Sequence, residues 1–342
     1  MEKLSFVIPC YGSELTIEGV LDEIHEVMAQ KPGIDYEIIC VNDSSPDGVL
    51  EVLHKRLKSD AKLIVADLAK NVGKASAVLA GYAFVSGDYV ANLDDDGQCP
   101  LDKLWDLVEP TLGESDVSFA YYTEKRQSLL KKMGSEINSI MSHYIVGKPR
   151  NLRTSNFFVV KRFVAEEMKK QKSKFPYLSG IILKTTCKIT NVYMKERERT
   201  EGRGSFTLKK SIILLMNGFT AFSVTPLRLS SLLGAIVALT GFAYGFFIIL
   251  RRLFINPYMA MGFPSLMSAI LLIGGLILLM LGMLGEYVGR IYIDQSNLPQ
   301  YVIKAVYLGD TTLKEAEKFA KNTCSRRREC ANRCVELSSR QR

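Results

Sequence analysis

The pattern of apolar and polar residues divides the chain into an alternating part and two long apolar stretches. In the first 200 residues, short apolar runs alternate with helical patterns. The apolar runs cover residues 4–8, 36–41, 63–66 and 89–93, and the helical patterns extend to about residue 30, to about residue 57 and over 75–85. Such alternation predicts an α/β domain with a mostly parallel sheet, which binds ligands at the carboxyl ends of its strands.

Two stretches without charged residues follow. Residues 229–250 are 22 uncharged residues, about 33 Å as a helix at 1.5 Å per residue, which matches the hydrocarbon core of a bilayer. Pro257 and Pro264 divide the second stretch, 253–285, so that its helix is expected over 263–285. The pattern predicts a two-helix transmembrane hairpin. Neither helix has a carboxylate or a basic residue, so a transporter is disfavoured.

Basic residues outnumber acidic ones around this hairpin. Four basic residues flank its outer ends and two lie in its connecting loop, which favours both ends on the cytoplasmic side. Residues 206–224 mix Lys209 and Lys210 with apolar residues and indicate an interfacial amphipathic helix. The predicted division is a catalytic domain at 1–205, interfacial helices at 206–228, the hairpin at 229–286 and a cytoplasmic C-terminal segment with a basic tail at 287–342.

Composition agrees with a chain of two parts. A mean hydropathy of +0.08 lies between that of a soluble enzyme and that of a multispan transporter. The net charge of +8 would suit nucleic acid, a membrane surface or anionic substrates. The run Arg326, Arg327 and Arg328 has no interleaved aromatic residues, which disfavours nucleic acid. The seven scattered cysteines favour neither a disulfide framework nor a zinc site, and no signal peptide is indicated.

Polar clusters follow three of the predicted strands, and these clusters carry the candidate chemistry. A tyrosine such as Tyr11 can stack on a base, and Asp43 can accept the imide N–H of a base. Three adjacent carboxylates repel one another, so the run of aspartates at 94–96 persists most easily around a divalent cation. In an extended segment Asp94 and Asp96 point to one side, Gln98 adds a neutral oxygen and Asp95 points elsewhere. Oxygen ligands imply Mg²⁺ or Mn²⁺.

The alternative interpretation of the aspartate run is a solvated acidic turn, since most charge runs are solvated faces. The position of the run directly after an apolar strand, with two further polar clusters at the same edge, favours the metal site instead.

Several motifs together resemble family 2 glycosyltransferases of the GT-A fold, which is a Rossmann-like α/β fold. They are FVIPCY at 6–11, VNDSSPDG at 41–48, NVGK at 71–74, AG at 80–81 and LDDDGQCP at 93–100. The sequence FSVTPLR at 222–228, directly before the hairpin, extends the resemblance to bacterial polyprenyl-phosphate glycosyltransferases related to dolichol-phosphate mannose synthase. The resemblance covers about residues 1–308.

The resemblance implies inverting transfer of a sugar from a nucleotide sugar, with UDP favoured, to a polyprenyl phosphate such as undecaprenyl phosphate. It implies Mg²⁺ or Mn²⁺ as cofactor and a multi-pass protein of the cytoplasmic membrane whose catalytic domain is cytoplasmic. The product would be a lipid-linked sugar donor for modification of cell-envelope glycans.

The resemblance also implies roles for individual residues. The nucleotide sugar would be bound by Pro9, Tyr11, Glu14, Asp43, Lys74, Asp94 and Asp95. The metal would be held by Asp94, Asp96 and Gln98. The acceptor phosphate would be bound by Lys131, Lys132, Ser135, Arg203 and Ser205. The catalytic groups would be Asp94, Asp96, Lys132 and Arg203.

The sequence departs from the family pattern at one position that bears on mechanism. Relatives often have Gly-Asp-Phe-Arg where this chain has Ser155, Asn156, Phe157 and Phe158, so a carboxylate sometimes proposed as a base is missing. A phosphate monoester has a second pKa near 6 and is already largely anionic at neutral pH, so it needs little help from a base. Catalysis is then expected to rest on charge.

Other functions fit less well. Leu68 and Ala75 break the spacing that a P-loop requires around Gly73 and Lys74, which excludes that NTPase motif. A processive polysaccharide synthase would have Gln-x-x-Arg-Trp, but the single tryptophan is Trp105. A catalytically inactive membrane adaptor with the same fold and a glycosyltransferase that acts on a sugar hydroxyl stay open as alternatives, as does a homo-oligomer.

Overall fold

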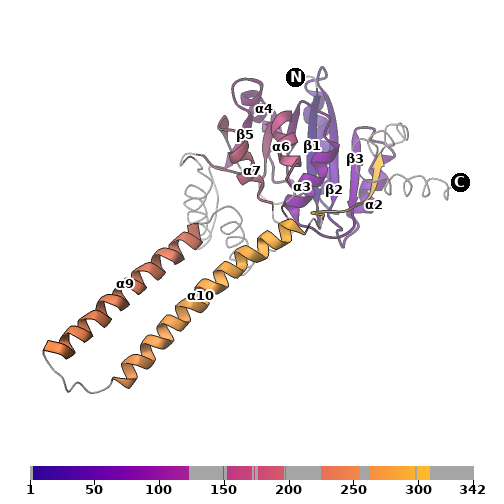
Figure 1. Ribbon diagram of the computed structural model, residues 1–342. Helices are drawn as coiled ribbons and strands as arrows, with labels where there is room; N and C mark the ends of the chain where they lie inside the picture. The colour runs from indigo at the N-terminus through magenta and orange to yellow at the C-terminus, as the bar shows by residue number, and fades with distance from the viewer. Residues whose placement is uncertain are drawn as a thin grey trace. The chain divides into compact units, whose positions relative to one another are not determined.

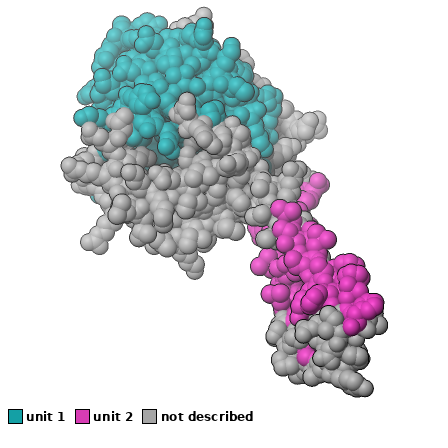
Figure 2. Space-filling model, turned by 90° about the vertical axis from the view of Figure 1, so that its left-hand side faces the viewer, with its two compact units in different colours: residues 1–207, 299–342 teal, residues 208–298 magenta. Residues whose placement is uncertain are grey.

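The computed structural model describes residues 3–122, 149, 152–171, 173, 176–195, 197, 225–254, 262–296 and 299–308. The chain forms two compact units, residues 1–207 with 299–342, and residues 208–298 (Figure 2). The first unit contains all the described strands, and the second contains two long helices (Figure 1).

The first unit is built on an eight-stranded mixed sheet with the order β7-β5-β6-β4-β1-β2-β3-β8. Its strands are β1 (Lys3–Cys10), β2 (Asp35–Asn42), β3 (Leu63–Leu68), β4 (Tyr89–Asn92), β5 (Val117–Tyr122), β6 (Phe158–Lys161), β7 (Ile189–Met194) and β8 (Ile303–Leu308). The pairs β4·β1, β1·β2, β2·β3 and β5·β7 are parallel, whereas β6 and β8 run antiparallel to their neighbours. The predicted mostly parallel α/β fold is confirmed.

Helices cover both faces of this sheet (Figure 1). Because side chains alternate along a strand, Leu4, Phe6 and Ile8 of β1 pack on one face and Val7 packs on the other. The first face is covered by α1 (Ile17–Ala29), α2 (Val49–Leu57) and α4 (Leu104–Leu112), and the second by α3 (Lys74–Gly81), α6 (Arg162–Lys169) and α7 (Leu178–Thr185). The 3₁₀ turns η1 (Tyr82–Phe84) and η2 (Leu101–Lys103) complete the described elements of the domain. Two apolar cores therefore hold the central strands from both sides.

The predicted strands of the first half agree with the structure, with boundaries shifted by one or two residues. The expected helix at 75–85 ends earlier, since α3 gives way at Gly81 to the tighter turn η1. Four strands were not predicted: β5, β6, β7 and β8. Of these, β8 lies beyond the second long helix, yet it pairs with β3 at the edge of the sheet. The C-terminal segment that was expected to be separate thus contributes a strand to the first unit.

The described part of the second unit contains α9 (Thr225–Phe254) and α10 (Phe263–Gln295). Large apolar side chains on both helices are exposed, for example Phe242 at 76% and Leu278 at 70%. Within the described residues, one stretch, Leu272–Ile293, is long and apolar enough to cross a bilayer, and a shorter apolar stretch, Gly234–Phe247, lies in α9. The two helices contain the predicted segments 229–250 and 263–285. The predicted interfacial helix lies almost entirely outside the described residues.

Candidate active site

The three polar clusters of the sequence meet at the carboxyl edge of the sheet. Strands β4, β1 and β2 are adjacent and parallel, so the segments that follow them emerge at one edge. Several hydrogen bonds join these segments directly. Glu14 N donates to Asp47 Oδ2 over 2.9 Å, and Gly12 N donates to Ser45 Oγ over 2.8 Å. The segments after β1 and β2 therefore form one connected polar surface.

Asp43 follows β2 and is buried at this edge. Its two carboxylate oxygens accept hydrogen bonds from Val72 N at 2.7 Å and Gly73 N at 2.9 Å, just before α3 begins. Gly73 has a φ of +86°, a conformation that favours glycine, and this turn aims its N–H at the carboxylate. Burial raises the pKa of Asp43, and the two backbone hydrogen bonds oppose that rise. Asp43 is thus a rigidly placed acceptor, as a base-reading carboxylate requires.

Asp95 turns away from its two acidic neighbours. Its Oδ2 accepts a hydrogen bond from Tyr11 N at 2.9 Å, and its main-chain oxygen accepts one from Thr16 Oγ1 at 2.6 Å. Burial raises the pKa of Asp95, hydrogen bonds from Tyr11 and Ser13 oppose the rise, and the charge of Asp94 adds to it. The central aspartate of the run therefore joins the segment after β4 to the segment after β1.

Asp94 contacts two side chains that come from different elements. Lys74, the first residue of α3, forms an ion pair with Asp94 Oδ1. Asn156 Nδ2 donates to Asp94 Oδ2 over 3.2 Å. Asn156 reaches this position because β6 runs antiparallel to β4, so the segment that precedes β6 lies beside the end of β4. An amide at this position can orient a carboxylate or a sugar hydroxyl, but it cannot accept a proton as a base would.

Gln98 holds a neighbouring segment. Its side-chain Nε2 donates to the main-chain oxygen of Arg197 over 3.4 Å, and Arg197 N donates to the main-chain oxygen of Gln98 over 3.4 Å. The Arg197 guanidinium in turn pairs with Glu23 at 2.6 Å and with Asp102. The Gln98 amide oxygen remains a candidate ligand, while its nitrogen anchors the chain six residues before Arg203.

The other predicted donor residues occupy distinct environments. Glu14 Oε2 accepts a hydrogen bond from Gly48 N at 3.0 Å, and a Cβ at Gly48 would lie 2.8 Å from Glu14 Oε1, so a larger residue there would displace the Glu14 carboxylate. Tyr11 is 53% exposed and open to a ligand, whereas Pro9 is buried in β1. The predicted acceptor residues Lys131, Lys132, Ser135, Arg203 and Ser205 lie outside the described residues.

The residues at the edge fit a divalent cation. Asp94 and Asp96 supply carboxylate oxygens, and the buried Asp94 Oδ1 accepts no directed hydrogen bond but has the Lys74 ammonium beside it. Within the described residues, no group of three or more His, Cys, Asp or Glu side chains could hold a metal. Proteins often bind Mg²⁺ through one or two carboxylates together with substrate phosphates. The arrangement fits a cation held jointly by the protein and a bound diphosphate.

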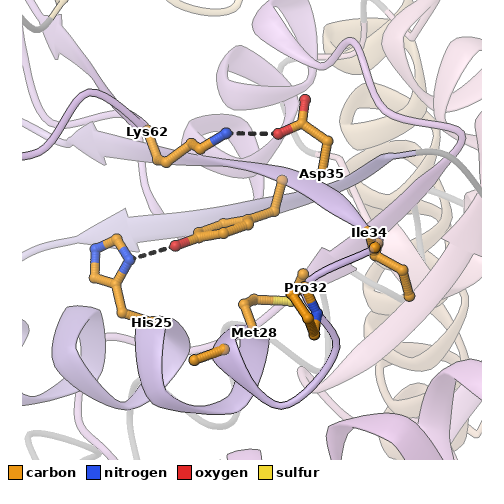
Figure 3. Close-up of a pocket in the computed structure, with 9 residues that line it drawn as sticks. His25, Met28, Pro32, Ile34, Asp35 and Lys62 are labelled. Carbon is orange, nitrogen blue, oxygen red and sulfur yellow. Dashed lines mark hydrogen bonds and ion pairs between the residues drawn. The ribbon is translucent and has the colours of Figure 1, made fainter.

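A depression of about 450 Å³ lies at the opposite edge of the sheet, between the end of α1 and the start of β2 (Figure 3). Its polar groups engage one another. His25 Nδ1 lies 2.6 Å from Tyr36 Oη, and Lys62 Nζ lies 2.6 Å from Asp35 Oδ1. Burial raises the pKa of Tyr36. The charged groups of this depression are paired with one another and are not directed at a common ligand. The carboxyl edge is therefore the candidate active site.

Three side chains that hold the predicted residues in place were not predicted from the sequence. Asp47, Asn156 and Arg197 were not assigned roles, although each contacts a predicted residue or its segment. The motif VNDSSPDG contained a signal for Asp47, since an aspartate side chain in a turn commonly accepts a hydrogen bond from the main chain two residues further on, as Asp47 does from Val49 N. No local pattern could have indicated Asn156 or Arg197, because their partners lie 62 and 99 residues away.

Comparison with known proteins shows the family of the chain. The family model "Glycosyl transferase family 2" matches residues 5–168, and the model "GtrB C-terminal hairpin" matches residues 225–291. The chain is 32% identical over 304 residues to "Uncharacterized glycosyltransferase YkcC" of Bacillus subtilis (strain 168), covering 89% of this chain and 94% of that protein. The chain therefore belongs to the family 2 glycosyltransferases.

Two further relatives have more specific names. The chain is 31% identical to the SfII prophage-derived bactoprenol glucosyl transferase of Shigella flexneri, over 90% of this chain and 99% of that protein. It is 30% identical to the undecaprenyl-phosphate 4-deoxy-4-formamido-L-arabinose transferase of Edwardsiella ictaluri (strain 93-146), over 92% of this chain and 97% of that protein. Similarity thus extends through both units of the chain.

Proposed function

We propose that this glycosyltransferase transfers a sugar from a nucleotide sugar to the phosphate of a polyprenyl phosphate, with a UDP-sugar and undecaprenyl phosphate as its substrates. One observation carries the proposal: a carboxyl edge with an intact aspartate cluster belongs to a chain that also has a GtrB-type hairpin. The names of the two more specific relatives support a lipid phosphate as acceptor.

The donor nucleotide lies across the segments that follow β1 and β2. Asp43, fixed by two backbone N–H groups, accepts the imide N–H of the base, and the exposed Tyr11 ring stacks on it. Lys74 lies beside Asp94, where its ammonium attracts the diphosphate. With the diphosphate beside Lys74, the sugar is expected near Asn156, because the Asn156 amide also contacts Asp94.

Asp94 and Asp96 would hold a divalent cation, with the Gln98 oxygen as a further candidate ligand. When bound, Mg²⁺ or Mn²⁺ supplies positive charge that stabilises the departing diphosphate. Asp95 keeps the segment in place through Tyr11, so that the two flanking carboxylates stay directed to the ligand side.

The acceptor phosphate attacks without a dedicated base. A phosphate oxygen forms the new bond to the anomeric carbon on the face opposite the leaving group, and the bond from that carbon to the diphosphate breaks. The nucleoside diphosphate departs with the bonding electrons, and the configuration at carbon inverts. Because the attacking oxygen is already anionic, the amide at Asn156 does not hinder the reaction. Lys131, Lys132 and Arg203 bring the two anions together, with Ser135 and Ser205 as further contacts to the phosphate.

The hairpin anchors the enzyme in the cytoplasmic membrane and crosses it twice. Support comes from β8, which follows α10 and pairs with β3 of the sheet whose other strands precede α9. A chain that leaves this domain and returns to it crosses a bilayer an even number of times. The exposed apolar side chains of α9 and α10 suit a lipid environment. Both ends of the hairpin then lie on one side of the membrane, and the basic residues that flank these ends favour the cytoplasmic side.

The test uses the full-length protein in detergent with a panel of UDP-, GDP- and dTDP-sugars. Each donor is offered with undecaprenyl phosphate, with undecaprenol, or without acceptor, and the lipid product is read by mass. The proposal expects one donor to give a lipid-phosphate sugar, with no product from undecaprenol. A product from undecaprenol would favour the hydroxyl-acceptor alternative. Absence of product with every donor, while nucleotides still bind, would favour an inactive adaptor.

A further inference from the structure

The strand that follows the hairpin lies against the segment that holds Asp43. Strand β8 pairs with β3, and Ala69 N, just beyond β3, donates to the main-chain oxygen of Val302 over 2.9 Å. The pairing shifts register between Asp67 and Leu68. The chain then continues through Ala69 to the two N–H groups that bind Asp43. One side of the donor site thus depends on a segment contributed from beyond the hairpin.

A charged side chain of β8 reaches a buried carboxylate in β3. Asp67 is almost fully buried, and its Oδ2 lies 3.3 Å from the Lys304 ammonium. Among the described residues, Asp67 Oδ2 accepts no directed hydrogen bond, so this ion pair is its compensation there. A buried carboxylate is costly unless it is paired or hydrogen-bonded. The ion pair with Lys304 therefore helps to hold the Asp67 carboxylate in its orientation.

Asp67 also contacts Asn42, the last residue of β2. Its Oδ1 accepts a hydrogen bond from Asn42 Nδ2 at 2.7 Å, and Asn42 Oδ1 accepts one from Ser45 N at 3.1 Å. Both polar atoms of the Asn42 amide are therefore engaged: the nitrogen contacts β3, and the oxygen contacts the segment after β2. Between Asn42 and Ser45, Ser44 has a φ of +50°, an uncommon conformation for a residue other than glycine. Asn42 stabilises this turn.

Ser45 connects the turn to the rest of the donor edge. Its hydroxyl accepts from Gly12 N at 2.8 Å and donates to Asp47 Oδ1 at 2.6 Å. A continuous series of contacts thus runs from Lys304 through Asp67, Asn42 and Ser45 to the segment after β1. Asp43 is the direct neighbour of Asn42 in this series.

We infer that Lys304 is a positioning residue for the nucleotide site, acting through Asp67 and Asn42 without touching the nucleotide. The inference deepens the proposed function and rests on it, because it assumes a nucleotide bound between the segments after β1 and β2. The Lys304 side chain is 66% exposed, so its ion pair contributes little to global stability. Its effect is expected in donor affinity, where a small displacement of Asp43 and the turn weakens several contacts at once.

The experiment measures binding of UDP with Mn²⁺ to the full-length protein in detergent by titration calorimetry. Lys304→Met is expected to weaken UDP binding about five- to tenfold, and Lys304→Arg is expected to restore it to within about twofold. Lys62→Met is the matched control, because Lys62 pairs with Asp35 at the opposite edge of the same sheet. In turnover assays the Lys304→Met change should raise the donor KM and leave kcat and the lipid KM near their wild-type values.

A second pair of variants separates positioning from folding. Asp67→Asn keeps an acceptor for Asn42 but removes the charge that needs Lys304. Asp67→Asn and Asp67→Asn/Lys304→Met should therefore bind UDP equally, and a further loss in the double variant would overturn the inference. UDP binding by Lys304→Met at the wild-type affinity would also overturn it. Failure of the wild-type protein to bind UDP, GDP or dTDP would instead overturn the proposed function, and the inference with it.

Discussion

The two edges of the sheet hold their carboxylates in different ways. At the amino edge, carboxylates meet cationic or imidazole groups: Lys62 Nζ lies 2.6 Å from Asp35, Lys3 Nζ 2.8 Å from Glu37, and His25 Nε2 2.6 Å from Asp60. At the carboxyl edge, Asp43, Asp47 and Asp95 accept hydrogen bonds from main-chain N–H groups.

A main-chain N–H orients a carboxylate without cancelling its charge. The ion pairs neutralise the carboxylates of the amino edge. At the carboxyl edge Asp94 is paired with Lys74, whereas Asp43 and Asp95 are held by main-chain N–H groups that leave their charge in place. The pKa directions follow the same division for four groups. Burial raises the pKa of Asp43 and of Asp95. The Lys62 hydrogen bond lowers the pKa of Asp35, and for Glu37 burial raises the pKa but bonds from Lys3, Ser5 and Ser86 outweigh it.

Asp47 departs from this division, because its pKa is lowered although it lies at the carboxyl edge. Burial raises the pKa, but hydrogen bonds from Ser45, Glu14 and Val49 outweigh that effect. Asp47 is therefore a structural acceptor that joins two segments, and the ligand-binding character belongs to its neighbours. The comparison teaches that main-chain hydrogen bonds can hold a carboxylate in place without cancelling its charge, as a ligand-binding site requires.

The largest effect is expected from removing the flanking charges at the carboxyl edge. Asp94→Asn combined with Asp96→Asn should lower kcat by about a thousandfold or more, because the carboxylates that would hold the cation are lost. Chelation of divalent cations should do the same to the wild type. Turnover is measured with the lipid product as readout. Metal-dependent turnover that survives in the double variant would refute the metal assignment.

The second effect concerns the donor nucleotide. Asp43→Asn should weaken binding of the nucleoside diphosphate by about ten- to a hundredfold, since a charged acceptor to the base is lost. Because burial raises the pKa of Asp43, nucleotide binding by the wild type should weaken on acidification at a pH above 3.8, the ordinary pKa of an aspartate. Calorimetry between pH 4 and 7 checks both points. An unchanged affinity in Asp43→Asn would show that another group reads the base.

The third effect separates charge from base catalysis at the acceptor. Lys132→Ala and Arg203→Ala should each lower kcat/KM for the lipid by about ten- to a hundredfold, since each removes a charged contact to a phosphate. Asn156→Ala should cost much less, because its amide only orients Asp94. The measurement is kcat/KM for the lipid across pH, with donor binding as control. If Asn156→Ala were the most damaging of the three, acceptor activation by charge would be wrong.

The amino edge should respond in stability and not in catalysis. Glu37→Gln should lower Tm by several degrees at pH 7, because the buried ion pair with Lys3 is lost, while turnover below Tm stays near wild type. The folded pKa of Glu37 lies below its ordinary value of 4.5, so its stabilisation is present above pH 4.5 and is lost as pH falls through the folded pKa. The Tm difference between variant and wild type should shrink over that range. A large loss of turnover with an unchanged Tm would contradict the division between the edges.

The central strands and their polar ends could be predicted because their signals are local. Apolar runs such as 36–41 are bounded by turn residues, and the ends of adjacent parallel strands must meet at one edge. Strand β8 could not be predicted with its partner, since pairing with β3 joins segments on either side of the hairpin. The alternation of Ile303, Ala305 and Tyr307 with Lys304 and Val306 indicates a strand, but nothing local indicates its neighbour.

The candidate site shows the same limit. Residue types and positions along the chain predicted Asp43, Asp94 and Asp96, because their chemistry is explicit in the side chain. The contacts of Asp95 with Tyr11 and of Asn156 with Asp94 depend on which strands are neighbours, and in what direction they run. Such contacts follow from the fold and cannot be derived from a motif.

The most direct test of sugar transfer to a lipid phosphate at the carboxyl edge is the rate of nucleoside diphosphate release from the nucleotide sugar. The full-length protein in detergent is given donor and Mn²⁺, with undecaprenyl phosphate or undecaprenol, and the Asp94→Asn/Asp96→Asn variant serves as control. We predict rapid release of nucleoside diphosphate only with undecaprenyl phosphate and only in the wild type. One lipid-phosphate sugar should form for each nucleoside diphosphate released. Release at the same rate with undecaprenol, or in the variant, would contradict the account.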